Sequence, residues 1–181
     1  MQRLLWFALV GLLAPRAAQA APPVLEAVDA PRSPIRMSAP AGWEVTTRRP
    51  RHRDLSTIAA MSPACAGGDD ISVAIQLDQE MKRPEQLLAD QYGAVKPARL
   101  RGWACVVRDS HNEVMCAGKV RGAPGILGVY FATTSAESYR RFGDPGDFTS
   151  RIAASISWKG KLARLVEWRR PATDAARSSC R

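Results

Sequence analysis

Two cysteines that flank a turn constrain the fold of this chain more than any other feature. Residues 109–112 have the composition of a tight turn, and the segments on both sides have strand-like sequences. If residues 110 and 111 form the tip of a hairpin, Cys105 and Cys116 lie directly opposite each other, within reach of a disulfide. A two-residue loop would put them at a hydrogen-bonded pair, the wider of the two pair types. The spacing nevertheless predicts a disulfide-braced hairpin.

The other two cysteines, Cys65 and Cys180, pair by elimination if the hairpin disulfide forms. Such a bond would close a long loop and stabilise the fold by roughly 4 to 5 kcal/mol on the chain-entropy account. The alternative is that Cys180 stays free or pairs with a second chain, because the tail around it has no apolar pattern. An even number of cysteines favours disulfides and an oxidising compartment. The pairing of Cys65 with Cys180 is left open between these alternatives.

The first twenty residues have the pattern of a signal peptide. Arg3 precedes an apolar run at 4–13 that is too short to span a bilayer, and Ala18 and Ala20 form the small-x-small pattern that signal peptidase cuts. No cysteine follows the cut, which disfavours a lipid anchor, and no second apolar run reaches spanning length. We expect cleavage near Ala20 and a soluble protein exported to the periplasm.

The exported form is basic. The formal net charge of +9 falls to +7 when Arg3 and Arg16 leave with the signal peptide. A basic protein is attracted to acidic proteins or anionic lipid surfaces, although its charge does not identify which of these is the partner. Nucleic acid is disfavoured because the protein is expected outside the cytoplasm. The ordinary apolar fraction and the mixed charges indicate a folded domain rather than a disordered chain.

Proline and charge patterns divide the chain into four parts. Residues 1–20 are the expected signal peptide, and 21–34 hold four prolines with little apolar periodicity, which indicates an extended leader. Residues 35–158 carry the patterns of one domain. Residues 159–181 combine a basic amphipathic segment, up to residue 170, with a small and polar tail that we expect to be flexible unless Cys180 holds it.

Alternating and wholly apolar runs predict the strands of the 35–158 domain. The clearest alternation predicts a half-buried strand at 71–77, and the run at 125–134 is apolar on both faces, as expected for a central covered strand. The first two strands are expected to pair around a turn at 40–42. The expected strands lie at 35–38, 43–46, 55–61, 71–77, 103–109, 113–118 and 125–134.

Two segments have helical spacing. The first begins at Pro84 and is stopped by Pro97, and the second is capped by Asp144. The apolar stripe of the second helix consists of Phe148, Ile152 and Ile156. Together these signals predict a single α+β domain, with a mostly antiparallel sheet that is covered by two or three helices and braced by disulfides.

The order of these signals resembles the Mog1/PsbP-like fold. The resemblance rests on residues 39–43, a form of the Pro-x-Gly-Trp opening after a strand, and on the closing helix with Phe148, Ile152 and Ile156. It covers residues 35–158 and implies a compact antiparallel sheet with helices on its faces. Proteins of this group serve largely as binding or accessory modules with varied partners, so the resemblance implies no catalytic residues.

The chain lacks a strong catalytic, metal or cofactor motif. Residues 109–111 contain the residue types of a hydrolase triad, but we expect neighbours at a turn to point apart. His52 and His111 lie in different predicted loops and the cysteines are scattered, which disfavours zinc. Residues 67–70 could offer two carboxylates to calcium, but turn chemistry explains them. We expect no cofactor, no metal and no enzymatic activity, with a small hydrolase as the minor alternative.

Two basic stretches are the candidates for a binding surface, because arginine and tryptophan are enriched where protein partners dock. The alternative is that these charges are simply solvated, which is the commoner case. The candidate binding residues are Arg48, Arg49, Arg51, Arg53, Lys161, Arg164, Trp168 and Arg169.

Protein binding without catalysis is the function that fits this sequence best. Small size, export and a braced core suit a stoichiometric binder, and the specific form we expect is an immunity protein that neutralises a secreted, envelope-targeting toxin. The alternative is an accessory component of an envelope assembly or secretion system, held at the membrane surface by the basic segment at 159–170.

Overall fold

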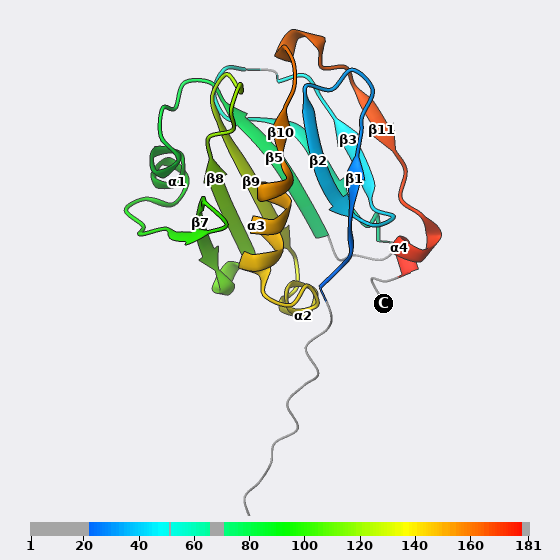
Figure 1. The fold of residues 1–181 in the computed structure, drawn as a ribbon. Coiled ribbons are helices and arrows are strands. Elements are labelled where there is room, and N and C mark those ends of the chain that lie inside the picture. Colours follow the sequence, from blue (N-terminus) through cyan, green and yellow to red (C-terminus); the bar gives the residue numbers. More distant parts are fainter. Residues whose placement is uncertain (1–21, 51, 66–70, 179–181) are drawn as a thin grey trace, which may run out of the picture.

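An antiparallel sheet of eight strands forms the body of the molecule, and a second sheet of three strands lies beside it (Figure 1). The computed structural model describes residues 22–50, 52–65 and 71–178. The large sheet consists, in spatial order, of β11 (Trp168–Arg170), β3 (Glu44–Thr47), β4 (Ser56–Ser62), β5 (Ile71–Asp78), β9 (Ile126–Thr133), β8 (Glu113–Gly118), β7 (Trp103–Arg108) and β6 (Ala98–Leu100). The small sheet consists of β1 (Leu25–Val28), β2 (Ile35–Pro40) and β10 (Ser157–Trp158).

Short and medium helices complete the fold, which is α+β as predicted. The helices are α1 (Pro84–Tyr92), α2 (Ala136–Arg140), α3 (Pro145–Ser155) and α4 (Asp174–Ser178), with 3-10 turns η1 (Asp109–His111) and η2 (Leu162–Arg164). The predicted signal peptide, residues 1–20, lies outside the described residues. None of the helices within the described ranges is both long enough and apolar enough to cross a membrane.

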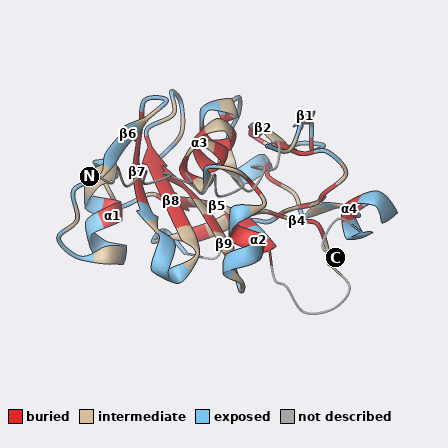
Figure 2. Ribbon diagram, turned by 90° about the horizontal axis from the view of Figure 1, so that it is seen from below, coloured by how far each residue is buried: buried red, intermediate tan, exposed pale blue. Residues whose placement is uncertain are grey.

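Helices α1 and α3 cover opposite faces of strands β7, β8 and β9 (Figure 2). Leu87 and Leu88 of α1 pack in one apolar cluster, and Phe148 and Ile152 of α3 pack in the other. Asp144 caps α3 as predicted, because its carboxylate accepts a hydrogen bond of 2.8 Å from the backbone N–H three residues on. The predicted first helix also forms, but it ends at Tyr92, before the glycine that follows.

The core beneath α3 is built from aromatic rings. Phe131 of β9 lies within ordinary ring-packing distance of three others, with centroid separations of 5.2 Å to Phe148, 5.3 Å to Phe142 and 5.8 Å to Tyr139. Strand β9 lies between β5 and β8 and is covered on both faces, which confirms the central strand predicted at 125–134. The alternation predicted for 71–77 is confirmed by the burial of Ile71, Val73, Ile75 and Leu77 in β5.

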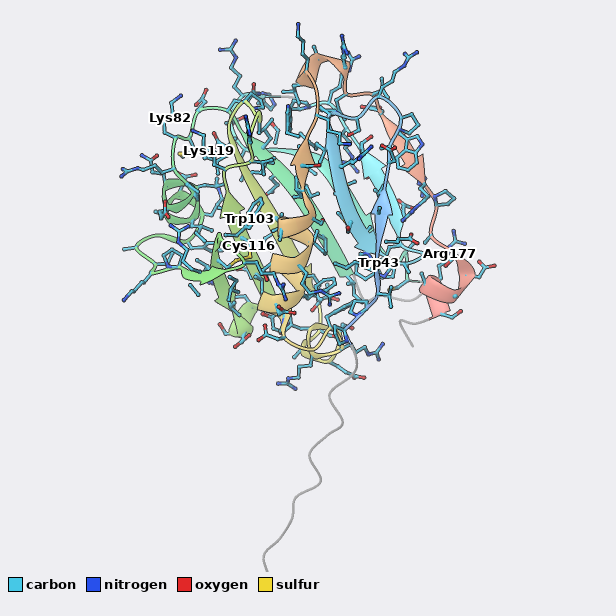
Figure 3. All side chains as sticks on the ribbon, in the orientation of Figure 1. Trp43, Lys82, Trp103, Cys116, Lys119 and Arg177 are labelled. Atoms are coloured by element: carbon cyan, nitrogen blue, oxygen red, sulfur yellow. A yellow bond between two sulfur atoms is a disulfide. The ribbon has the colours of Figure 1, made fainter. Side chains whose placement is uncertain are left out.

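The disulfide between Cys105 and Cys116 forms as predicted, between cross-strand partners of β7 and β8 whose Cα atoms are 4.0 Å apart. The turn is longer than two residues, because η1 is followed by Asn112 at φ +53°, yet the register is the one the spacing predicted. Both cysteines are buried in the same apolar cluster as Phe148 and Ile152 of α3, and Figure 3 labels one of them, Cys116. Cys65 is also disulfide-bonded, and Cys180, its expected partner, lies outside the described residues.

The prediction that the first two strands pair with each other is wrong. β2 pairs with β1 and β10, whereas β3 pairs with β4 and β11. The turn between them carries the chain from one sheet to the other: Gly42 has φ +76°, and Trp43 is buried with its ring 5.6 Å from that of Phe142.

Both ends of the described chain are more ordered than the sequence predicts. The leader at 21–34 contributes strand β1, with Val28 and Ala30 buried, so the fold begins before residue 35. Residues 171–178 form part of the fold as well. Helix α4 buries Ala176, and Thr173 N–H donates a 2.8 Å hydrogen bond to the carbonyl of Gly42. The tail was expected to be flexible unless Cys180 holds it, and Cys180 lies outside the described residues.

Candidate functional site

Five connecting segments gather at one end of the two sheets, at the top of Figure 1. They meet there because alternate connections between antiparallel strands lie at the same end of a sheet. These segments, which we call the basic end, are 29–34, 48–55, 79–83, 119–125 and 159–167. Backbone hydrogen bonds join them to one another. Lys159 N–H donates to the carbonyl of Pro34 at 2.7 Å, and Gln79 N–H donates to that of Arg53 at 2.8 Å.

The basic end carries eleven Lys and Arg residues and four acids within the part of the chain that the structure describes. All of these cations are exposed. Every ion pair between described residues takes its cation from elsewhere, for example Arg101 with Asp147 at 2.8 Å. The cations are Arg32, Arg48, Arg49, Arg53, Lys82, Arg83, Lys119, Arg121, Lys159, Lys161 and Arg164, and the acids are Asp29, Asp54, Glu80 and Glu167.

Figure 3 shows this separation for the residues that it labels. Lys82 and Lys119 lie toward the upper end of the molecule, whereas Arg177 lies lower, on α4. Arg177 has an acidic neighbour, Asp174, at 3.6 Å, but Lys82 and Lys119 have none among the described residues. Neither of these two lysines therefore takes part in an ion pair with an acid that the structure describes.

Five of the cations surround one hollow of about 580 Å³, which we call the basic hollow. They come from three of the five segments, and they are Arg32, Arg49, Lys159, Lys161 and Arg164. No acidic side chain lines this hollow. The structure thus brings the two predicted basic stretches together, with Arg32 as a third contributor that the sequence did not reveal.

The walls of the basic hollow are fixed by hydrogen bonds to the backbone of 159–167. Arg49 Nε donates to the carbonyl of the fully buried Leu165 at 2.8 Å, and Thr47 Oγ1 donates to the carbonyl of Val166 at 2.9 Å. This bond uses only Nε. The two terminal nitrogens of Arg49 make no hydrogen bond with the described residues and can bind an anion.

Arg32 has a left-handed backbone conformation, with φ +56°. This conformation is unfavourable for a residue with a side chain by roughly 1 to 2 kcal/mol, and such strain is concentrated at functional sites. The turn is stabilised by Ser33, whose N–H donates to the carbonyl of Ala30 at 3.1 Å and whose Oγ accepts from Ile35 N–H at 3.1 Å.

The other predicted binding residues lie next to the basic hollow. Arg48, Trp168 and Arg169 line an adjoining hollow of about 420 Å³, in which Arg169 is paired with Glu44 at 2.6 Å. Arg53 is exposed in the 48–55 segment, although its side chain lines neither hollow. Arg51 lies outside the described residues.

A third hollow, of about 670 Å³, opens beside the basic hollow and is lined by two tryptophans. We call it the tryptophan hollow. Trp103 and Trp158 contribute its aromatic walls, and Lys119 and Arg121 contribute its cations. The sequence does not reveal this hollow, because its aromatic and basic residues come from β7, β10 and the loop after β8 and have no shared spacing.

The basic segment at 159–170, for which the sequence suggests membrane binding as an alternative, packs largely against the rest of the fold. It forms η2 and the edge strand β11, and Leu165 is fully buried while Leu162 and Trp168 pack against the core. Leu162 and Trp168 are only partly buried, so packing reduces the apolar surface of the segment that could enter a lipid bilayer.

Ser110 and His111 do contact each other, contrary to the expectation that turn neighbours point apart. Ser110 Oγ lies 2.9 Å from His111 Nδ1, and an Arg108 nitrogen lies 2.9 Å from Nε2. A guanidinium only donates, so Nε2 accepts and Nδ1 carries the proton, which leaves the ring unable to accept one from Ser110. Asp109 instead accepts a hydrogen bond from Tyr139 at 3.1 Å. The three residues do not form a triad.

A polar network joins Arg108 to two tyrosines on the α1 side of the sheet. Glu113 accepts a 2.6 Å hydrogen bond from the Tyr130 hydroxyl and pairs with Arg108 at 2.9 Å. Arg108 in turn lies 5.3 Å from the ring centre of Tyr92. Burial away from water, reinforced by Glu113, raises the pKa of Tyr130 to about 12 and raises that of Tyr92 further. The raised pKa values keep both hydroxyls protonated at neutral pH, and that of Tyr130 acts as a structural donor.

A mainly apolar hollow lies away from the basic end. This hollow, of about 720 Å³, lies between Trp43, Phe142 and α4, and its described lining is apolar except for Arg141 and Thr173. Across the described ranges, no group of three or more His, Cys, Asp or Glu residues could hold a metal ion. The sequence at 67–70, considered for calcium, lies outside these ranges.

No family model, curated protein or solved structure matches this chain. The resemblance to the Mog1/PsbP-like fold therefore stays a prediction. The chain's own geometry singles out the basic end, with its two adjoining hollows, as the candidate functional site.

Proposed function

We propose that this protein is a non-catalytic binding module that docks an acidic surface of another protein on its basic end. The observation that carries the proposal is the collection of eleven exposed Lys and Arg residues at one end of the fold, none of them in an ion pair with a described acid. Unpaired charges of one sign steer an oppositely charged partner and suppress partners of like charge.

The arrangement of the basic hollow supports binding over simple solvation. Solvated charge runs have mobile side chains, whereas Arg49 is held against the carbonyl of Leu165 and the Lys159 backbone is held against Pro34. A site whose groups are already in place loses less conformational entropy when a partner binds. Arginine adds a planar fork that suits carboxylates.

The compartment we propose is the periplasm. The Cys105–Cys116 disulfide fits an oxidising compartment, and the signal-peptide pattern at 1–20 would direct the chain there. In this setting the specific role we propose is that of an immunity protein, which neutralises a secreted toxin by covering an acidic region of it.

Charge reversal tests the proposal. The tagged exported form, beginning at residue 21, is used to capture proteins from envelope extracts, in parallel with K161E/R164E and with a control, K96E/R140E. Both variants exchange one Lys and one Arg for Glu at exposed positions, and only the first alters the basic hollow. We expect K161E/R164E to lose partners that the wild-type protein and the control retain, and capture to weaken as salt rises.

Two results would contradict the proposal. If K161E/R164E captures the same proteins as the control, the basic hollow is not the docking site. If the wild-type protein floats with phosphatidylglycerol vesicles and captures no protein that depends on the basic hollow, the alternative of a membrane-surface accessory is correct instead.

A further inference from the structure

Building on the proposed function, we infer that the segment of the partner that binds the basic end carries an aromatic side chain among its acidic residues, and that this side chain enters the tryptophan hollow. The inference rests on the position of an aromatic-walled, cation-rimmed hollow directly beside the basic hollow.

The aromatic walls of the tryptophan hollow are fixed in place. The Trp103 ring packs directly against the backbone at Gly118, where a Cβ would lie only 2.5 Å from Cε3 of the ring. The Trp158 indole donates through Nε1 to the carbonyl of Gly160 at 2.6 Å, and Ile156 is buried beside it. Ordered tryptophans beside an open surface hollow can anchor an aromatic or large apolar side chain of a partner.

The rim of the tryptophan hollow selects for negative charge. Lys119 and Arg121 are exposed there, and neither is paired with an acid among the described residues. A neutral apolar segment would leave both cations unmatched, whereas carboxylates beside the aromatic side chain would pair with them. The occupant that fits is therefore acidic as well as aromatic.

The two hollows are close enough for one short segment to occupy both. Ser157 and Trp158 line the tryptophan hollow, and Lys159, Gly160 and Lys161 line the basic hollow. Trp158 and Lys161 are three positions apart in the chain, a span of at most about 10 Å when extended. An extended peptide of four or five residues could thus place an aromatic side chain on one side and carboxylates on the other.

Two soluble polymers of matched length test the inference: poly-glutamate and a glutamate–tyrosine copolymer. We expect the wild-type protein to bind the copolymer about tenfold more tightly than poly-glutamate, as one buried aromatic anchor implies. Binding of the copolymer should also change the tryptophan fluorescence.

The substitution Ser157→Trp distinguishes the contribution of the aromatic side chain to binding from the contribution of the cations. Ser157 is exposed on the wall of the tryptophan hollow, so a large side chain there fills the hollow and leaves every cation in place. We expect S157W to bind both polymers with the wild-type affinity for poly-glutamate. The control is Ser72→Trp, an identical change at an exposed position of β5, which should keep the preference for the copolymer.

The possible failures are distinguishable. Equal affinity of the wild-type protein for the two polymers, or a copolymer preference that survives in S157W, overturns the aromatic anchor and leaves the proposed docking of an acidic surface standing. If K161E/R164E binds poly-glutamate as tightly as K96E/R140E does, the proposed function itself fails, because the basic hollow then contributes nothing specific.

Discussion

Arg49 and Leu165 lie 116 residues apart in the sequence, and a 2.8 Å hydrogen bond joins the Nε of one to the backbone carbonyl of the other. This bond connects the two basic stretches that the sequence presents as separate. Leu165 is fully buried, so its carbonyl depends on this donor rather than on bulk water. The contact therefore contributes both to the stability of the 159–167 segment and to the shape of the basic hollow.

The substitution Arg49→Lys tests this contact, because it keeps the charge and removes the Nε donor. We expect the free energy of unfolding, measured by urea denaturation, to fall by about 1 to 2 kcal/mol. Arg48→Lys is the matched control, since the Arg48 side chain makes no hydrogen bond with described residues, and it should leave stability unchanged. Equal stability of the two variants would show that the bond contributes nothing.

Removal of the hairpin disulfide by C105A/C116A should destabilise the protein by about 3 kcal/mol. The two cysteines are 11 residues apart, and opening a loop of that size increases the conformational entropy of the unfolded chain by roughly this amount. Both side chains are also buried in the core beneath α3. Thermal unfolding of the double variant provides the measurement, and an unchanged midpoint would contradict the bracing role.

A methyl group at Gly118 should disturb the tryptophan hollow. Because a Cβ there would lie 2.5 Å from the Trp103 ring, Gly118→Ala forces the indole to move and should reduce stability by about 1 to 3 kcal/mol. Gly160→Ala is the control, since its nearest atom would be 3.8 Å away. Urea denaturation and tryptophan emission spectra measure the two effects. If both variants behave alike, the close approach at Gly118 is unimportant.

The Tyr130 hydroxyl should make stability depend on pH in the alkaline range. Its pKa is about 12 in the folded protein and about 10 in the unfolded chain, because folding buries it beside Glu113. Between these values the unfolded chain loses a proton that the folded protein keeps, so the free energy of unfolding falls as pH rises from about 10 to about 12. Below that window both states keep the proton, so this group adds no pH dependence.

Tyr130→Phe checks this prediction. The free energy of unfolding of the variant should decline less steeply across the same alkaline window. Denaturant titrations at a series of pH values measure this decline. Tyr92 and Tyr139, whose pKa values are also raised by burial, should retain part of the decline. A slope identical to that of the wild-type protein would mean that Tyr130 titrates normally in the folded state.

The elements that the sequence predicted correctly are those with a local physical cause. The alternation from Ile71 to Leu77 reports one buried face of a strand, and Asp144 followed by Pro145 reports the start of a helix. The symmetric placement of Cys105 and Cys116 about a turn reports their register. Each of these predictions depends only on residues that are near one another in the sequence.

The elements that were missed depend on distant parts of the chain. Alternation shows which face of a strand is buried, but it does not identify the neighbouring strand, so β2 and β3 were wrongly paired. Strand β11 has two arginines in three residues and no alternation, and it forms because β3 offers a free edge. Helix α2 has five residues, too few for a helical period to be visible.

The candidate site was visible only in fragments. The two basic stretches stand out as runs of charge, whereas Arg32 is isolated in a proline-rich segment and Lys119 and Arg121 flank a single valine. These residues converge because the connections between antiparallel strands lie at the same end of the sheet, and the order of the strands is a property of the whole sheet. No local pattern carries that information.

The gathering of the cations at one end also gives the molecule a permanent electric dipole moment, directed roughly along the strands. In the field of an anionic partner the protein would rotate before contact, so that the collision begins with the correct end foremost. Fewer encounters are then wasted on unproductive orientations. Reversing charges elsewhere on the surface should change how fast complexes form without touching the contacts that hold them together.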